Sequence, residues 1–265
     1  MPFHLPHPNL SVVIPAYNEA ERILPYLTNI TSYLNRRGQP YEVLVVDDGS
    51  HDDTAVRVSA FRLDEPAVRV MRLPRNTGKG AAVRMGMLEA RGDLRLIADA
   101  DGATPIEELE RLESRVRHGA DLAVGSRSLA SQDRRYSVNA RWHRSVLGNC
   151  FNGIVRRLGV NGISDTQCGF KLLRGTVARD LFSVGRVNGY GFDLEILYVA
   201  QRRGYRIAEV PVNWNEQAGS KVRIVRDGMQ MIRDLLAVRH HYQQGYYVQM
   251  DMGHLIRSHR PQAFT

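Results

Sequence analysis

Short apolar runs alternate with amphipathic stretches along the first half of the chain. Five runs of five or six residues are rich in Val, Leu and Ile, as buried strands are, and they lie at residues 10–15, 41–46, 68–73, 94–98 and 121–125. Helical patterns separate them at residues 18–37, 52–63, 81–90 and 105–118. Strands that alternate with helices predict an α/β fold with a mostly parallel sheet and helices on its faces.

The second half has a less regular pattern. Helical spacing recurs at residues 139–158, 193–202 and 225–240, a strand pattern lies at 207–212, and polar loops lie at 163–170 and 214–221. The last helix carries an apolar stripe of Val225, Met229, Ile232 and Leu236. Because no repeat, low-complexity segment or linker is visible, we expect one domain over residues 1–240 and a basic tail over 241–265.

Composition and charge narrow the classes of function. The chain has 265 residues, 43% of them hydrophobic and 24% charged, which is ordinary for a globular protein. Its net charge of +8 and pI of about 9.8 indicate an anionic partner: nucleic acid, an anionic membrane face or a phosphorylated small molecule. Residues 134–164 alone carry six Arg and no acid. Nucleic acid is disfavoured, because no known reader motif is present.

Export and membrane spanning are not predicted either. No apolar stretch approaches the roughly 20 residues of a membrane span. Pro and His stand near the N-terminus, where a signal peptide would have a basic region and an apolar core. The two cysteines, Cys150 and Cys168, are too few for a disulfide framework and wrongly spaced for zinc. We therefore expect a cytoplasmic protein.

Polar residues and glycines follow the predicted strands, at residues 15–19, 47–50, 76–80, 99–104 and 125–127. Ligands bind at this edge of a parallel sheet. Asp99 and Asp101 can hold a divalent cation against a diphosphate; a lone Asp-x-Asp is more often a solvated turn, but the neighbouring segments favour the metal. Gly78-Lys79-Gly80 lacks the spacing of a Walker loop. Its glycines would let backbone amides approach a phosphate, and an exposed lysine beside a turn is an equal alternative.

The ordered motifs resemble the family 2 inverting glycosyltransferases of the GT-A fold. In the first half these are VVIPAYNE (12–19), VVDDGS (45–50), NTGKGAA (76–82), DADGAT (99–104) and GSR (125–127). In the second half, the motifs that look like those of polyprenyl-phosphate sugar transferases are DTQCGFKL (165–172), GFDLEIL (191–197), EVPVNW (209–214) and GSK (219–221). The dolichyl-phosphate β-glucosyltransferase branch is closer than the dolichyl-phosphate mannose synthases. The resemblance, over about residues 10–240, implies a Rossmann-like sheet with a nucleotide-sugar half (10–127), an acceptor half (128–240) and amphipathic C-terminal helices.

The resemblance also implies roles for residues at the strand ends. Nucleotide-sugar contacts are implied for Pro15, Tyr17, Glu19, Asp48, Lys79, Asp99, Ala100, Asp101 and Lys221. A plain helix start is the alternative for Glu19, and shaping of a turn is the alternative for Asp47. Asp101, with Asp99, would hold Mg²⁺ or Mn²⁺. The mannose synthases read DADLQ here, and their Gln helps to hold the metal; this chain has Gly102-Ala103-Thr104, as the glucosyl branch does, so the third protein ligand stays open.

A phosphate acceptor is already an anion, so it needs cationic positioning rather than a strong base. By resemblance, Arg127 supplies this positioning and is, with Asp101, the catalytic candidate. Arg144 or Arg141 would be a second clamp, and a solvated helix face is an equal alternative for both. Asp193 and Glu195 could bind sugar hydroxyls or pair with nearby arginines, and because their spacing puts them on different helix faces, at most one is expected to point at the substrate. The roles of Asp165 and Gln167 stay open.

We therefore expect inverting transfer of a hexose, glucose from UDP-glucose, to a polyprenyl or dolichyl phosphate, with a β-linked product. GDP-mannose as donor, transfer to another hydroxyl, and a binding module without catalysis are the alternatives. The apolar stripe of residues 225–236, flanked by arginines, predicts peripheral contact with the cytoplasmic face of an anionic membrane. Packing of the stripe on the sheet is the alternative. The oligomeric state is not predicted.

Overall fold

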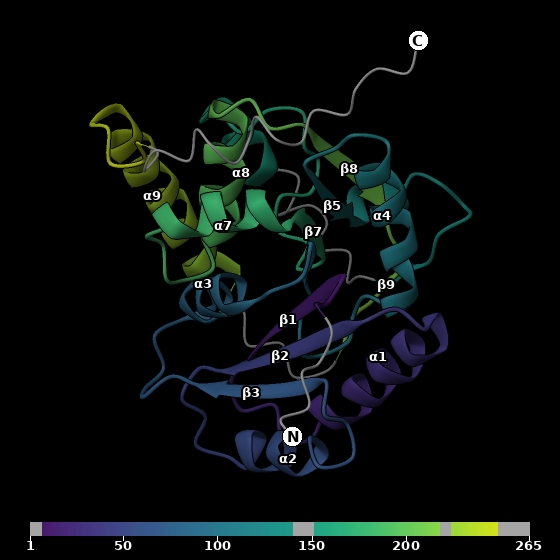
Figure 1. Ribbon diagram of the computed structural model, residues 1–265. Helices are drawn as coiled ribbons and strands as arrows, with labels where there is room; N and C mark the ends of the chain where they lie inside the picture. Colours follow the sequence, from purple (N-terminus) through teal and green to yellow (C-terminus); the bar gives the residue numbers. More distant parts are fainter. Residues whose placement is uncertain (1–6, 140–150, 218–223, 249–265) are drawn as a thin grey trace.

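One seven-stranded sheet runs through the computed structural model, which describes residues 7–139, 151–217 and 224–248 (Figure 1). Its strands are β1 (Leu10–Ala16), β2 (Tyr41–Asp47), β3 (Val68–Arg72), β4 (Leu94–Ile97), β5 (Leu122–Ser126), β7 (Lys171–Arg174) and β8 (Ile207–Pro211). Their spatial order is β3-β2-β1-β4-β7-β5-β8. Only β7 is antiparallel to its neighbours within this sheet, so the predicted mostly parallel sheet is confirmed.

Helices cover both faces of the sheet (Figure 1). They are α1 (Ile23–Arg37), α2 (Thr54–Phe61), α3 (Lys79–Glu89), η1 (Ile106–Glu108), α4 (Leu109–Arg117), α5 (Arg127–Ala130), α7 (Gly175–Val184), α8 (Phe192–Arg202) and α9 (Ile224–Gln243). One core lies between the sheet and α1, α2 and α4, and the other between the sheet and α3, α7, α8 and α9. Along β1, Val12 and Ile14 enter the first core and Val13 the second, because successive strand residues face opposite sides.

The pattern of the sequence does not predict β7 or α7. The strand has only four residues, and charged Lys171 and Arg174 stand at its ends, so no apolar run marks it. It is nevertheless central, because it pairs with β4 on one side and β5 on the other. A strand with two neighbours and helices on both faces is buried whatever its length. The segment predicted as a loop at 163–170 therefore leads directly into the middle of the sheet.

Helix α1 begins at Ile23, five residues later than predicted. Asn18 has a φ of +50°, in the left-handed region, which interrupts a helix. Three successive backbone N–H groups, at residues 18–20, donate to side chains in the loop before α2 and at the start of this helix: Ser50, Thr54 and Asp52. These bonds hold the end of β1 as a turn against the end of β2. Helix α2 begins at Thr54, whose backbone N–H donates to the carboxylate of Asp52 at 3.0 Å.

The predicted apolar stripe of α9 is only partly packed against the sheet, which was the alternative to membrane contact. Its buried stripe is Met231, Leu235 and Val238. Met229 and Leu236, from the predicted apolar stripe, are 53% and 49% exposed. The side chain of Val225 lies outside the described residues. In the described ranges, none of the helices combines the length and apolarity needed to cross a membrane.

Candidate active site

The carboxyl ends of β1, β2 and β4 border a cleft of about 500 Å³. It is lined by the segments after these strands, by the start of α3 and by two residues before α8: Gly189 and Tyr190. Eight of the nucleotide-sugar candidates line it: Pro15, Tyr17, Glu19, Asp48, Lys79, Asp99, Ala100 and Asp101. The ninth, Lys221, lies outside the residues that the structure describes. The structure thus brings together eight predicted residues that are up to 86 positions apart in the sequence.

An ion pair and a second carboxylate stand side by side in this cleft. Lys79 Nζ lies 2.6 Å from Asp99 Oδ1. Burial disfavours both charges, but the negative charges of Asp99 and Asp193 outweigh it and raise the pKa of Lys79. For Asp99, burial is outweighed by Lys79, Lys171 and Arg127, which lower its pKa. Burial and the negative charge of Asp99 raise the pKa of Asp101, so a cation at this position would relieve an unfavourable contact.

Asp99 and Asp101 fit a divalent cation that a diphosphate helps to bind. Asp101 Oδ1 accepts the N–H of Ala103 at 3.0 Å, which fixes the direction of its carboxylate. Among the described residues, no three His, Cys, Asp or Glu side chains gather into a group that could hold a metal alone. Mg²⁺ is commonly bound by one or two carboxylates, with water and substrate phosphates completing its shell. The donor set here matches that pattern.

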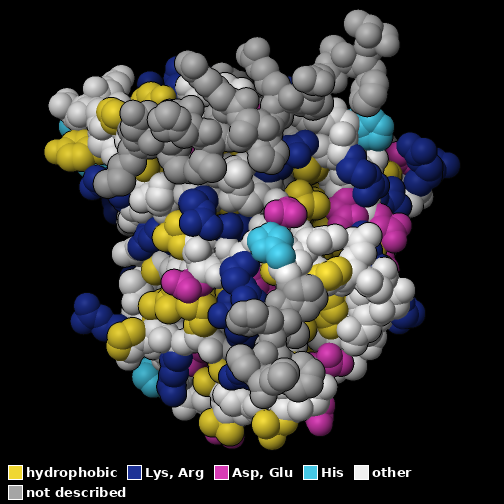
Figure 2. All heavy atoms as spheres, in the orientation of Figure 1, with side chains coloured by type: hydrophobic (Ala, Val, Ile, Leu, Met, Phe, Trp, Pro, Cys, Tyr) yellow, Lys and Arg dark blue, Asp and Glu magenta, His cyan; other side chains and the backbone are white. Residues whose placement is uncertain are grey.

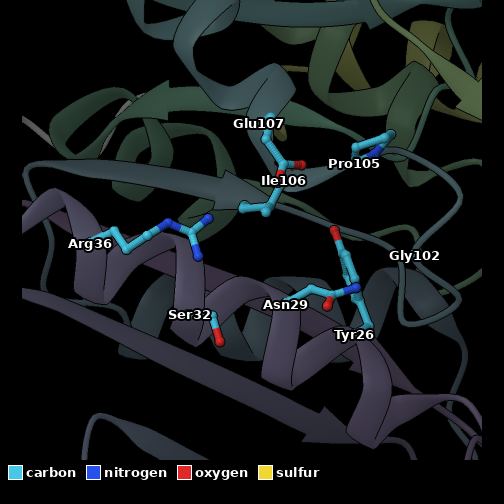
Figure 3. A pocket seen from close by; sticks show the side chains of 8 residues that line it. All are labelled: Tyr26, Asn29, Ser32, Arg36, Gly102, Pro105, Ile106 and Glu107. Carbon is cyan, nitrogen blue, oxygen red and sulfur yellow. The ribbon is translucent and has the colours of Figure 1, made fainter.

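The loop at residues 99–104 is supported from behind by α1 (Figure 3). Tyr26 is buried beneath it, and its hydroxyl donates to the carbonyl of Thr104 at 3.3 Å. Gly102 has a φ of +66°, and a Cβ there would lie 2.9 Å from the ring of Tyr26. Figure 3 shows Tyr26 at one end of a separate cavity of about 320 Å³ between α1 and Pro105–Glu107. Conformation and space therefore both favour glycine at position 102, where the mannose synthases have Leu.

Asp48 ties the loop before α3 to the end of β2. Its two carboxylate oxygens accept the N–H groups of Thr77 and Gly78, each at 2.8 Å. Burial raises its pKa. Its neighbour Asp47 is fully buried, accepts the N–H of Ser50 at 3.0 Å and pairs with Arg72 at 3.1 Å. Asp47 thus shapes the turn, as its alternative interpretation held.

The glycines around Lys79 let a second backbone segment approach the start of α3. A Cβ at Gly78 would lie 2.4 Å from the carbonyl oxygen of Asn188, and one at Gly80 would lie 2.5 Å from that of Val187. The carbonyl of Asn188 also accepts the N–H of Ala81, in the first turn of α3. The glycines therefore make room for the backbone of residues 187–189 beside the start of α3.

Arg22 and Tyr190 are polar side chains of the cleft that lie outside the motifs found in the sequence. Arg22 donates to both carboxylate oxygens of Glu19, at 2.7 and 2.8 Å, in a fork-shaped pair. Its position within a predicted helix gave no signal. Tyr190 comes from the far half of the chain and lines the cleft beside Lys79. An aromatic residue between two glycines, directly before the GFDLEIL motif, was the available signal for it.

Arg127 begins α5, directly after β5, and is held in one orientation. Its backbone N–H, Nε and Nη2 all donate to the carboxylate of Asp165, at 3.0, 2.7 and 2.8 Å. The guanidinium lies 5.4 Å from the ring centre of Trp214. Burial would lower the pKa of Arg127, but Asp165 raises it. Asp165 therefore orients Arg127. The two other acceptor candidates, Arg141 and Arg144, lie in the range 140–150, outside the described residues.

The sugar-binding expectation for Asp193 and Glu195 is not supported by their surroundings. Asp193 is buried and pairs with Lys171, the two charged atoms being 2.6 Å apart. Glu195 is 1% exposed, and its carboxylate accepts the N–H groups of Arg186 and Val187 at 2.8 and 2.9 Å. Tyr247 donates its hydroxyl to the same carboxylate. Glu195 is thus held by these three contacts and is not among the residues that line the cleft.

Comparison with known proteins places these features in a family. The sequence profile described as "Glycosyl transferase family 2" matches residues 11–182. A dolichyl-phosphate beta-glucosyltransferase of Trichomonas vaginalis is 41% identical over 90% of this chain and 73% of its own length. The dolichyl-phosphate beta-glucosyltransferases of Saccharomyces cerevisiae and Homo sapiens are 38% and 39% identical, over 90% and 91% of this chain and 76% and 78% of theirs.

Solved structures agree on the fold. Glucosyl-3-phosphoglycerate synthase from Mycobacterium tuberculosis, in complex with UDP, superposes with a TM-score of 0.65 and 21% identity, over 87% of this chain and 80% of that one. The same enzyme with Mn²⁺, UDP and glucosyl-3-phosphoglycerate gives a TM-score of 0.64 and 20% identity, over 88% and 78%. At this level of identity the likeness is one of architecture.

Proposed function

The chain belongs to glycosyl transferase family 2, and we propose that it transfers glucose from UDP-glucose to dolichyl phosphate or another polyprenyl phosphate. The relatives described above are 38–41% identical to this chain over about nine-tenths of its length, and they are named dolichyl-phosphate beta-glucosyltransferases. The observation that carries the proposal is the cleft itself. It combines Lys79, Asp99 and Asp101 at the sheet edge where nucleotides bind, with Arg127 close enough to influence the charge of Asp99.

We propose that the cleft holds the donor through its diphosphate. Lys79 supplies a positive charge at the start of α3, and Tyr17 and Glu19 line the neighbouring wall, where the nucleoside would lie. Asp99 and Asp101 would hold Mg²⁺ or Mn²⁺, which when bound neutralises negative charge on the departing UDP. The fold neighbours crystallised with Mn²⁺ and UDP lend support to this assignment.

The acceptor phosphate then needs orientation more than activation. One of its oxygens attacks the anomeric carbon of glucose, the bond from that carbon to UDP breaks, and the configuration inverts to β. Arg127 would orient the phosphate, because Asp165 and Trp214 hold its guanidinium in one direction and leave further N–H groups on it. A phosphate is already deprotonated at neutral pH, so no carboxylate base is required. The burial of Asp193 and Glu195 in other contacts agrees with such a reaction.

We also propose that the protein meets its lipid acceptor as a peripheral protein at the cytoplasmic face of a membrane. Exposed Met229 and Leu236 lie along one side of α9, one heptad apart, with exposed Arg226 and Arg233 between and beside them. Figure 2 shows hydrophobic and basic side chains together where α9 lies, at the upper left of the molecule. An apolar strip with flanking arginines suits an anionic bilayer surface.

A donor and acceptor panel tests the proposal. The protein would be incubated with UDP-glucose, UDP-galactose or GDP-mannose, and with a short polyprenyl phosphate or 3-phosphoglycerate, each with Mn²⁺ and with EDTA. We expect transfer from UDP-glucose to the polyprenyl phosphate, and its loss in EDTA. Faster transfer from GDP-mannose would overturn the donor, and transfer to 3-phosphoglycerate alone would overturn the acceptor.

A further inference from the structure

A buried ion pair lies next to the donor cleft and takes no part in the chemistry proposed above. Lys171, on β7, is 1% exposed, and Asp193, in the first turn of α8, is 4% exposed. Nζ of Lys171 lies 2.6 Å from Oδ1 of Asp193 and also donates to the carbonyl of Cys168. In the sheet, Lys171 pairs with Ile97, two residues before Asp99. Lysine is rarely found at such a position, since burying its charge is costly.

Lys171 holds the backbone turn that contacts the carboxylate of Asp99. The carbonyl that it binds belongs to Cys168, and the next residue is Gly169. A Cβ at Gly169 would lie 2.0 Å from Asp99 Oδ2, so the carboxylate is packed directly against the backbone of Gly169. Any shift of the turn at 168–170 would therefore move the carboxylate or release it.

Asp193 acts on the other partner of the cleft ion pair. Phe192, the residue before it, places its ring centre 5.9 Å from Nζ of Lys79. The charge of Asp193 favours charged Lys79, and the charge of Lys171 favours ionised Asp99. The two ion pairs, Lys171–Asp193 and Lys79–Asp99, are thus neighbours, and their four charges sum to zero.

We propose that the Lys171–Asp193 pair positions Lys79 and Asp99 for the diphosphate of the donor. It does so through the backbone of residues 168–169 on one side and the start of α8 on the other. This inference rests on the proposed function, because it takes the cleft as the nucleotide-sugar site. Lys171 and Asp193 are positioning residues, since neither lines the cleft. A buried pair is weak evidence for a role in stability alone, because apolar residues often replace such pairs without loss.

Asp193→Asn tests the proposal, because it removes the charge and keeps a hydrogen-bond acceptor for Lys171. The matched control is Asp180→Asn. Asp180, on α7, is also 4% exposed and pairs with Arg203, whose side chain is 9% exposed, but it is not part of the cleft. For each variant we would measure the melting temperature, the Kd of UDP with and without Mn²⁺, and the KM of UDP-glucose and of a short polyprenyl phosphate.

We expect Asp193→Asn to raise the Kd of UDP and the KM of UDP-glucose by about tenfold, the loss typical when a residue behind a ligand-binding group is changed. The KM of the polyprenyl phosphate should not move, and Asp180→Asn should change stability only. Equal UDP affinity in the two variants, at similar melting temperatures, would overturn the proposal.

A second variant covers the case in which Asp193→Asn does not fold. Lys171→Met/Asp193→Leu replaces both charges with apolar groups, and we expect it to fold and still bind UDP about tenfold more weakly. Native affinity for UDP in this variant, or failure of both variants to fold, would overturn the positioning role. UDP affinity does not involve the lipid, so wild-type protein that binds UDP but glucosylates no polyprenyl phosphate would refute the proposed function and leave this inference standing.

Discussion

Two ion pairs of the site, Lys79–Asp99 and Arg127–Asp165, have similar distances but differ in the number of contacts and in exposure. Lys79 and Asp99 meet through a single pair of atoms at 2.6 Å, and the Asp99 side chain is 37% exposed to the donor cleft. Arg127 and Asp165 meet through three hydrogen bonds, and the Asp165 side chain is only 7% exposed. A lysine is a flexible point charge, whereas an arginine fork fixes a plane.

The difference indicates what each side of the site must do. On the donor side, a diphosphate and a cation must be able to enter between a lysine and two carboxylates, which a single contact allows. On the acceptor side, an arginine must present its remaining N–H groups in one direction, which the carboxylate of Asp165 and the ring of Trp214 enforce. The donor side thus leaves room for a ligand between its charged groups, whereas the acceptor side holds its arginine in one orientation.

The largest effect is expected on the donor side. Asp101→Ala removes a candidate metal ligand, and we expect kcat to fall by about 10³-fold, since a bound cation is worth several kcal/mol in the transition state. The melting temperature should stay close to that of the wild type, because within the described residues the Asp101 side chain accepts a single hydrogen bond, from the N–H of Ala103. Initial rates over a series of Mn²⁺ concentrations check this prediction. Near-normal activity would contradict the assignment of Asp101 as a metal ligand.

The second prediction tests the fixed side. Arg127→Lys keeps the charge but loses the fork, so we expect kcat/KM for the polyprenyl phosphate to fall by about 10²-fold while the Kd of UDP stays the same. The control is Arg135→Lys, which alters an exposed fork between Arg135 and Asp133 and should have no effect. A change in UDP affinity in Arg127→Lys would place the arginine on the donor side instead.

The strands that border the cleft could be predicted from the sequence because each is a continuous apolar run followed by polar residues. The same reasoning missed β7, whose burial comes from its neighbours and not from its own composition. It also placed the start of α1 too early, since the turn at residues 18–20 depends on side chains of a loop 32–35 positions away.

The site shows the same division. Motifs located Lys79, Asp99 and Arg127, but their surroundings were out of reach, because Asp165 meets Arg127 across 38 positions of sequence. Glu195 was assigned to the sugar because its motif lies near the site, yet its carboxylate binds backbone N–H groups only eight and nine residues before it. Sequence could identify which residues carry charge, but the partner of each charge was set by the fold.

A third and smaller effect concerns stability and pH on the acceptor side. Arg127 overcomes the effect of burial and lowers the pKa of Asp165 below its unfolded value of about 3.9. The ionised carboxylate therefore stabilises the fold above that value, and this contribution is lost as the pH falls through the folded-state pKa. We expect Asp165→Asn to lower the unfolding free energy by about 2–3 kcal/mol at pH 7.

The pH dependence separates this prediction from a general loss of packing. The difference between wild type and Asp165→Asn should shrink on acidification below about pH 4, because the variant lacks the ionisable group. Urea unfolding at pH 7, 5 and 3.5 measures it. A difference that is constant across this range would mean that the charge of Asp165 contributes nothing.

The smallest effect is expected outside both ion pairs, on α9. Met229→Glu or Leu236→Glu should weaken sedimentation with anionic vesicles several-fold and raise the apparent KM for a long polyprenyl phosphate in vesicles, without changing UDP affinity. Leu63→Glu is the control, since Leu63 is 84% exposed but lies after α2, on the opposite face of the sheet. Equal loss in the control, or equal recovery with neutral vesicles, would contradict a specific membrane face.

The linkage formed in the product tests the account most directly. The wild-type protein would be supplied with UDP-glucose carrying ¹³C at the anomeric carbon, Mn²⁺ and a short polyprenyl phosphate, and the product would be examined by NMR. The account predicts glucose attached through the acceptor phosphate, with ¹³C–³¹P coupling, and in the β configuration. An α-linked product, or glucose attached to anything other than the phosphate, would contradict it.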